Sequence, residues 1–213
     1  SAVKSSSNTT NQPINQSTNS PLRLIPIIGF AGLFLLYVAT LAQSPVLGDP
    51  SEYTFVAHIP GIAHPPGYAF MVLLGKLFQT IIPFGTIAWR VHLMAAVAGT
   101  TTAVFIYGII QAWQPLTSLP RWQHMAVGLL TALIVGTAVN QWQHSIHANP
   151  HIITGTFLLA NLFLLTKWAV SQRDDRRDAP SARLYLYLFC ISAGLGVTHH
   201  PLTVFAFPVY TRF

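Results

Sequence analysis

The chain has 213 residues, of which 52% are apolar and only 8% carry a charged side chain, and its formal net charge is +6. A soluble domain usually has about 25% charged residues, so this chain has too few polar groups to cover a surface in water. It has no basic helix face and no basic patch interleaved with aromatic residues, which excludes nucleic acid as a partner. Long apolar runs without alternating polarity instead indicate an integral membrane protein with helical spans.

The first 20 residues consist largely of Ser, Thr, Asn and Gln. Such a segment buries too little apolar surface to offset the entropy lost on ordering, so residues 1–20 are predicted to be a disordered cytoplasmic tail. No small-residue cleavage site follows it, and the first apolar run is expected to be retained as a span. Residues 21–213 are predicted to form one transmembrane helical domain, which ends inside an apolar stretch and is expected to be incomplete at its C-terminus.

The apolar runs predict an all-α, polytopic fold with about five spans, each needing roughly 20 residues, plus an outer juxtamembrane helix. The predicted spans cover residues 22–42, 88–113, 122–148, 152–170 and 184–198. A further apolar segment, residues 67–84, is short, carries Lys76 in its middle and ends near Pro83. We predict that this segment lies along the outer interface, or dips into the membrane and returns.

The orientation follows from the positive residues. If residues 67–84 crossed the membrane, the arginine-rich stretch QRDDRRDAPSAR would lie outside, against the preference of Lys and Arg for cytoplasmic loops. If they do not cross, then Lys4, Arg23, Arg121 and the arginine-rich stretch are all cytoplasmic. The predicted location is thus a bacterial inner membrane or its equivalent, with the N-terminus in the cytoplasm.

With this topology, ionisable residues from distant segments meet at the outer face. They are Asp49, Glu52, His58, His64, Arg90, His144, His147, His151, His199 and His200. Such side chains are expensive in lipid and usually face a cavity, so their gathering at one end of the spans predicts a site.

The loop GDPSEYTFVAHIPGIAHPPGYAF, residues 48–70, carries the strongest signal. Asp49 and Glu52 are three residues apart, so a helical turn would place both carboxylates on one face. A structural interpretation is also open, because Asp49 beside Pro50 has the pattern of a helix N-cap followed by proline at the first helical position.

The histidines allow two interpretations. His144, His147 and His151 have the spacing of one helix face, which could hold zinc, copper or a haem iron. Asn149 and Pro150 are expected to end that helix and displace His151, so we favour polar packing and predict no metal site. His199 and His200 end a span, where they could contact a substrate phosphate or hydroxyl, or satisfy free carbonyls of the helix end.

Several short motifs follow one another from Gly48 to about Leu93: Asp-x-x-Glu-Tyr, Ile-Ala-His-Pro-Pro-Gly-Tyr, Leu-Leu-Gly-Lys-Leu-Phe, Pro-Phe-Gly and Ala-Trp-Arg-Val. This series resembles the N-terminal portion of GT-C type polytopic membrane glycosyltransferases related to protein O-mannosyltransferases. The resemblance implies transfer of a sugar from a polyprenyl-phosphate carrier to an acceptor hydroxyl at the outer membrane face. It also implies contact with membrane lipid and leaves other membrane proteins open as partners.

The resemblance assigns roles to particular residues. It implies that Asp49, with Glu52 as its neighbour, is the catalytic carboxylate that acts as general base or orients the acceptor. His64 and Arg90 match positions near the phosphate of the sugar donor, where a guanidinium can bind in bidentate fashion. His199 and His200 are the other predicted substrate-binding residues. No cofactor is predicted with certainty, and a divalent cation is left open.

One position departs from the family pattern. Relatives carry a Glu-Val-Tyr motif where this chain has Asn149-Pro150-His151, which removes a carboxylate from the expected pocket. The alternative function is therefore a non-catalytic transmembrane subunit of a larger complex that retains the fold. A histidine-rich metal or haem binder is a third, weaker hypothesis.

Overall fold

The structure is a computed structural model that describes residues 22, 24–113, 118–173 and 180–211. The predicted N-terminal tail and residues 174–179 of the arginine-rich stretch lie outside the described residues. The described part is helical and contains no strand, which confirms the predicted all-α fold. Its helices are α1 (Leu24–Thr40), α2 (Asp49–His58), α3 (Ala69–Ile81), α4 (Ile87–Ala112), α5 (Arg121–Thr137), α6 (Val139–Ser145), α7 (Pro150–Arg173), α8 (Pro180–His199), the 3₁₀ helix η3 (Pro201–Ala206) and α9 (Phe207–Tyr210).

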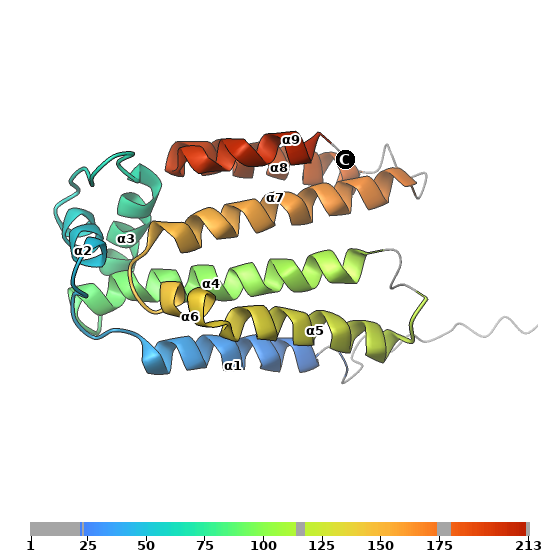
Figure 1. Ribbon diagram of the computed structural model, residues 1–213, viewed down its shortest axis with the longest axis horizontal. Coiled ribbons are helices and arrows are strands. Elements are labelled where there is room, and N and C mark those ends of the chain that lie inside the picture. Colours follow the sequence, from blue (N-terminus) through green and yellow to red (C-terminus); the bar gives the residue numbers. More distant parts are fainter. Residues whose placement is uncertain (1–21, 23, 114–117, 174–179, 212–213) are drawn as a thin grey trace, which may run out of the picture.

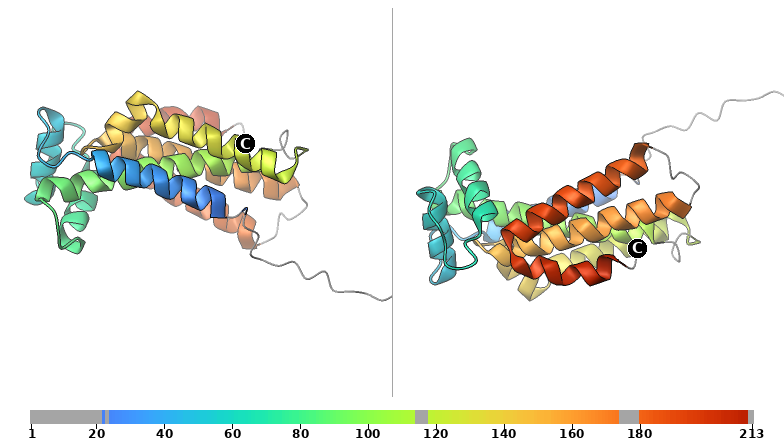
Figure 2. Two further views of the ribbon diagram at one scale, coloured as in Figure 1. Left: turned by 90° about the horizontal axis from the view of Figure 1, so that it is seen from below. Right: turned by 90° about the horizontal axis from the view of Figure 1, so that it is seen from above.

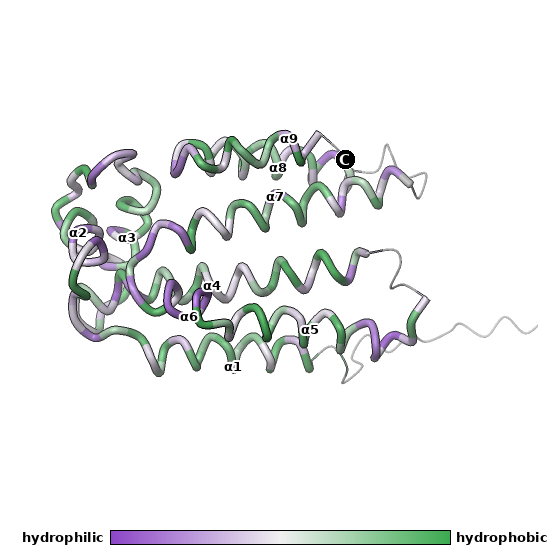
Figure 3. Tube along the Cα trace, viewed as in Figure 1, coloured by the Kyte–Doolittle hydropathy of each residue, from purple (hydrophilic) through white to green (hydrophobic). Residues whose placement is uncertain are grey.

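The long helices run side by side along the longest axis of the molecule, while α2 and α3 form a cap at one end (Figure 1). Helix α4 is central and packs against α1, α3, α5, α6 and α7. Apolar residues follow one another along the bundle helices, as Figure 3 shows. Many large apolar side chains on them are exposed, among them Ile28 of α1 and Ile134 of α5. A surface of this kind is suited to lipid rather than water.

Three helices are long and apolar enough to cross a membrane, namely α4, α7 and α8. Helices α5 and α6 qualify as a fourth span if the bent pair is counted as one. Helix α1 is apolar but has 17 residues. It lies along α4 and α5 in the same bundle (Figure 1). The described residues therefore form a multi-spanning helical membrane protein.

Helix α3 does not cross the membrane. Its 13 residues extend over about 20 Å at 1.5 Å per residue, whereas the hydrocarbon core is about 30 Å thick. The helix runs across the end of the bundle rather than along it (Figure 2). This agrees with the prediction for residues 67–84. Lys76 in its middle donates a hydrogen bond to the carbonyl of His58 at 2.8 Å, so the ammonium group is held against the end of α2.

The segment predicted as one span over residues 122–148 is broken. Ala138 has extended backbone angles, and α6 is turned by 68° from α5. Contacts with α1 stabilise the bend, because the Tyr37 hydroxyl donates to the Gly136 carbonyl at 2.6 Å and the Trp142 indole donates to the Thr40 hydroxyl at 3.0 Å. These partners are about 100 residues apart in the sequence, so local pattern could not reveal the break.

The fold separates two ends. Helices α2 and α3, the start of α4, helix α6, the start of α7 and the end of α8 meet at one end (Figures 1 and 2). At His199 the chain turns, and η3 and α9 run back along the bundle. Arg121 and Arg183 lie near the other end, at the first turns of α5 and α8. Every residue predicted for the site thus lies at the α2–α3 end.

Candidate functional site

The carboxylate of Asp49 is free at the start of α2. Gly48, with a φ of 90° that favours glycine, is the N-cap, and no side chain caps the helix. Asp49 is the first helical residue and is exposed. The interpretation of Asp49 as an N-cap is therefore wrong, because the helix begins one residue earlier. The positive end of the helix dipole lies beside this carboxylate.

Glu52 is held by His64 through both of its oxygens. The His64 backbone N–H donates to Oε1 at 2.6 Å, and the His64 Nδ1 lies 2.8 Å from Oε2. The side-chain hydrogen bond from His64 lowers the pKa of the Glu52 carboxyl, and the backbone hydrogen bond lowers it further. The same side-chain contact raises the pKa of His64, which favours the imidazolium. The two side chains form an ion pair at the solvent boundary, with 40% of His64 and 36% of Glu52 exposed.

Two tyrosines surround this ion pair. The Tyr53 hydroxyl lies 3.4 Å from Nε2 of His64. The ring of Tyr68 packs edge-to-face against both Tyr53 and His64, with centroid distances of 5.4 and 5.7 Å. Tyr68 is buried and has a φ of 48°, which is uncommon for a residue with a side chain. Packing on several sides holds the residue in this backbone conformation, a situation often found at functional sites.

Tyr68 also joins the ion pair to the end of α8. Its ring centroid lies 5.9 Å from that of His199 and 5.5 Å from that of His200. The structure thus brings three predicted site residues, His64, His199 and His200, around one tyrosine, and Glu52 joins them through His64. Tyr68 was not among the site residues predicted from the sequence. Its place at the end of the Ile-Ala-His-Pro-Pro-Gly-Tyr motif is the signal that could have identified it.

Arg90, predicted near the donor phosphate, is engaged elsewhere. Its Nε donates to the carbonyls of Phe84 and Gly85 at 3.0 and 3.2 Å, and its Nη1 donates to the carbonyl of Gln79 at 3.0 Å. The guanidinium therefore binds backbone carbonyls at the end of α3 and in the turn that follows it. Among the described residues, no hydrogen bond or ring contact joins Arg90 to His64.

His144, His147 and His151 do not share a helix. His144 is in α6, His147 is in the connection and His151 is in the first turn of α7. The ring centroid of His144 lies 6.1 Å from those of both His147 and His151. The helix is interrupted as expected, but earlier than Asn149: α6 ends at Ser145, and Pro150 is the first residue of α7. No group of three His, Cys, Asp or Glu side chains among the described residues is placed to hold a metal ion.

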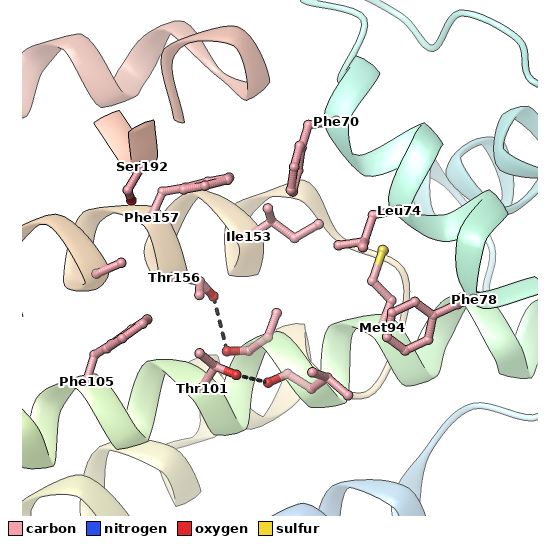
Figure 4. Close-up of a pocket in the computed structure, with 13 residues that line it drawn as sticks. Phe70, Leu74, Phe78, Met94, Thr101, Phe105, Ile153, Thr156, Phe157 and Ser192 are labelled. Carbon is pink, nitrogen blue, oxygen red and sulfur yellow. Dashed lines mark hydrogen bonds between the residues drawn. The ribbon is translucent and has the colours of Figure 1, made fainter. Parts of the chain in front are cut away.

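An apolar cavity of about 320 Å³ lies between α3, α4, α7 and α8 (Figure 4). Aromatic side chains from three helices line it, namely Phe70, Phe78, Phe105 and Phe157. Phe70 and Phe157 also contact the His199 ring, at centroid distances of 6.1 and 6.2 Å. His199 is 1% exposed, and its Nε2 donates to the Pro150 carbonyl at 3.1 Å. The buried His199 ring therefore packs between two residues that line the apolar cavity and the polar cluster around Tyr68.

The site as a whole is amphipathic. It offers an exposed carboxylate, an ion pair and several imidazoles at the end of the bundle, and an apolar cavity lies nearby between the helices. Such an arrangement can bind a ligand with a polar head and an apolar tail.

The family model of the protein O-mannosyl-transferase TMEM260 N-terminal domain matches residues 49–213. The chain is 28% identical over 190 residues to the protein O-mannosyl-transferase tmem260 of Dictyostelium discoideum, covering 85% of this chain and 22% of that protein. It is 32% identical over 154 residues to the protein O-mannosyl-transferase TMEM260 of Mus musculus, covering 72% of this chain and 20% of that protein.

No solved structure matches the chain. The chain spans about a fifth of the length of these curated relatives, 22% and 20% respectively. The family match begins at Asp49 and includes the whole of the site described above. The chain belongs to the family defined by the TMEM260 N-terminal domain of protein O-mannosyl-transferases.

Proposed function

We propose that this chain is the N-terminal part of a membrane glycosyltransferase. In this proposal the enzyme transfers a sugar, mannose by analogy with the names of its relatives, from a polyprenyl-phosphate donor to an acceptor hydroxyl at the outer membrane face. The observation that carries the proposal is that the polar cluster around Tyr68 and the apolar cavity are neighbours, with the His199 ring in contact with both Tyr68 and the cavity-lining Phe70.

The proposed donor fits this arrangement of a polar cluster beside an apolar cavity. A polyprenyl phosphate has a charged head and a long apolar tail, and the cavity lies between helices that cross the membrane. An isoprenoid chain in the cavity would contact Phe105 and Phe157, while its head would lie near His199. Burial of each methylene contributes about 0.8 kcal/mol, so a tail of even a few isoprene units would bind appreciably.

Asp49 has the properties of the acting carboxylate. It is exposed, and among the described residues no hydrogen bond engages it, whereas Glu52 is held by His64. In the proposed step, Asp49 accepts the proton of the acceptor hydroxyl while the hydroxyl oxygen bonds to the anomeric carbon. The bond from that carbon to the phosphate oxygen breaks, and the polyprenyl phosphate leaves with the electron pair. Nearby imidazoles offset its charge. No step is assigned to a divalent cation, because no three ligands for one gather among the described residues.

The orientation remains that predicted from the arginine distribution. The site lies at the end of the bundle opposite Arg121 and Arg183. If positive residues mark the cytoplasmic side, the site faces outward.

A second candidate, a non-catalytic subunit that keeps the fold, is favoured by one observation. Asn149 occupies a position where a carboxylate was expected, and its amide is engaged by the His144 ring at 3.0 Å and the His151 backbone N–H at 2.8 Å. This side chain therefore has a structural role in the connection before α7 and cannot act as a base.

The test is transfer by the protein encoded by the complete reading frame that contains this chain. The purified protein in nanodiscs would receive a radiolabelled polyprenyl-phosphate mannose and a serine- or threonine-containing acceptor peptide. Labelled peptide that depends on the protein is expected. Absence of transfer across a panel of polyprenyl-phosphate sugars, together with stable co-purification in a complex, would favour the subunit.

A further inference from the structure

Two histidines near the start of α7 have one ring nitrogen fixed as an acceptor. The backbone N–H of Leu202 donates to Nδ1 of His200 at 3.0 Å. Oδ1 of Asn149 accepts from the His151 backbone N–H, so the amide nitrogen of Asn149 faces Nδ1 of His144 at 3.0 Å and donates to it. A neutral imidazole with an acceptor Nδ1 carries its proton on Nε2. His144 and His200 therefore each present an Nε2–H donor.

His151 lies between these two donors. Its ring centroid is 6.1 Å from that of His144 and 6.1 Å from that of His200, and its side chain is exposed. Among the described residues, no hydrogen bond occupies the His151 ring or Nε2 of His144 or His200. Three imidazoles thus lie next to one another, with His151 exposed, His144 half-buried and His200 buried, and with unused donors on the ring nitrogens that make no backbone or amide contact.

No acidic side chain compensates this cluster. The described carboxylates are those of Asp49 and Glu52, and Glu52 is paired with His64. Helix α7, which spans 24 residues, begins at Pro150 and directs the positive end of its dipole toward the same place. Donors without acceptors beside a helix N-terminus favour an anion.

The chemistry of the cluster distinguishes an anion from a metal ion. A metal ion needs lone pairs that converge on one point, but the Nδ1 lone pairs of His144 and His200 are already used, and no three ligands converge here. A phosphate group accepts hydrogen bonds on several oxygens, so it can bridge donors that are more widely separated.

We propose that His144, His151 and His200 form a phosphate-binding site at the start of α7. The site adjoins the ion pair of Glu52 and His64, because His200 contacts Tyr68. Identifying the ligand as the phosphate of a lipid-linked sugar donor rests on the proposed function. Binding of a phosphate anion does not, because it follows from the three imidazoles alone.

The experiment is a phosphate titration of the purified chain in neutral detergent, with the imidazole signals followed by ¹H–¹⁵N NMR. Inorganic phosphate is expected to shift the signals of His144, His151 and His200 along saturable curves. His58 is the internal control, because it lies at the far end of α2 with Nδ1 against Gln79 at 3.2 Å. Equal shifts of His58 and the three cluster histidines, or no saturable shift, would overturn the site.

A matched pair of variants tests the assignment. His151→Phe keeps a planar ring at an exposed position but removes both nitrogens. It should weaken phosphate binding about tenfold, as expected for loss of a hydrogen bond to a charged group. His58→Phe makes the same change outside the cluster and should leave the affinity unchanged. Equal affinity of His151→Phe and wild type would refute the role of His151.

A second titration separates the two sources of phosphate. Polyprenyl phosphate in phosphatidylcholine nanodiscs should shift the same three signals and compete with inorganic phosphate. If only inorganic phosphate shifts them, the anion site stands and the lipid phosphate is excluded as its ligand. That outcome would count against the proposed sugar donor without affecting the anion site.

Discussion

The Glu52 carboxylate accepts two hydrogen bonds from one residue, His64, through the backbone N–H at 2.6 Å and the imidazole Nδ1 at 2.8 Å. This double contact fixes the loop after α2 and leaves Glu52 little freedom to accept a further proton. Asp49, one helical turn earlier, has no such partner among the described residues. The two carboxylates therefore differ in their contacts: Glu52 is bound to His64, and in the proposed function Asp49 is the one that acts on the acceptor.

Replacement of Asp49 tests this division of roles. Asp49→Asn keeps the size of the side chain but removes its charge, and no fold contact depends on it. We expect transfer by the complete protein to fall by about 10²- to 10⁴-fold, the usual contribution of a general base. The rate would be measured with labelled polyprenyl-phosphate sugar at matched expression.

Glu52→Gln is the companion variant, and we expect it to reduce transfer less than Asp49→Asn does. Circular dichroism and size-exclusion profiles would show that both variants are folded. Equal rates for Asp49→Asn and wild type would assign Asp49 to helix α2 alone and remove it from the catalytic step.

The sequence was sufficient to predict the helical membrane fold and the end of the bundle where the site lies. Long apolar runs predict spans, and Lys76 and Pro83 indicate that the segment of residues 67–84 does not cross the membrane. The pairing of Glu52 with His64 was not predictable, because the two residues are 12 positions apart and their contact depends on the path of the loop that follows α2. The same holds for Arg90, whose partners are carbonyls exposed only because α3 ends at Ile81.

The ion pair predicts a pH dependence with a definite sign. The folded-state pKa of Glu52 lies below its usual 4.5, so its contribution to stability is full above that value and is lost as the pH falls further. The folded-state pKa of His64 lies above its usual 6.5, so its contribution is full below that value and is lost as the pH rises. The pair should therefore stabilise the loop most between pH 4.5 and 6.5.

Direct titration of His64 by NMR checks this prediction. In the wild type its midpoint is expected above that of a free histidine, and Glu52→Gln should lower it. Asp49 and Tyr53 also face His64 from α2, and Tyr68 faces it from the start of α3. Asp49→Asn should lower the midpoint less than Glu52→Gln does, because Asp49 acts only through its charge. An unchanged midpoint in Glu52→Gln would show that the pair does not form in solution.

The orientation predicts which loops are accessible from outside the cell. In a Cys190→Ala background, a cysteine at Ser51 in α2 should react with an impermeant maleimide in intact cells. A cysteine at Ser181, in the first turn of α8, should react only after permeabilisation. The opposite pattern would place the site in the cytoplasm and would exclude an acceptor at the outer face.

Close packing of α3 against the bundle predicts a sensitive glycine. A Cβ atom at Gly75 would lie 2.9 Å from Cβ of Ala57 in α2 and 3.4 Å from the side chain of Val91 in α4. Gly75→Leu should therefore destabilise the protein by about 1–3 kcal/mol, as overpacking usually does. Gly155→Leu in α7 is the control, because nothing lies within 4 Å of a Cβ there. Thermal unfolding in detergent should show a lower midpoint for Gly75→Leu than for Gly155→Leu, and equal midpoints would contradict the packing of α3.

The apolar cavity between α3, α4, α7 and α8 is the proposed binding site for the tail of the sugar donor. Thr101 lines the cavity, and its hydroxyl bonds only to the Val97 carbonyl of its own helix, so Thr101→Phe can fill the space without breaking a contact between helices (Figure 4). Thr131→Phe is the matched control, because its hydroxyl makes the same bond to Val127 within α5, which does not line the cavity. If the tail occupies the cavity, Thr101→Phe should raise the KM for a long-chain donor about tenfold or more, the equivalent of two lost methylene contacts. A donor with a much shorter chain should be affected less, since it gains little from the cavity in the wild type. Equal effects on the two donors would mean that the substitution disturbs the site in another way. No effect on either donor would place the tail outside this cavity, on the lipid-facing surface of the bundle.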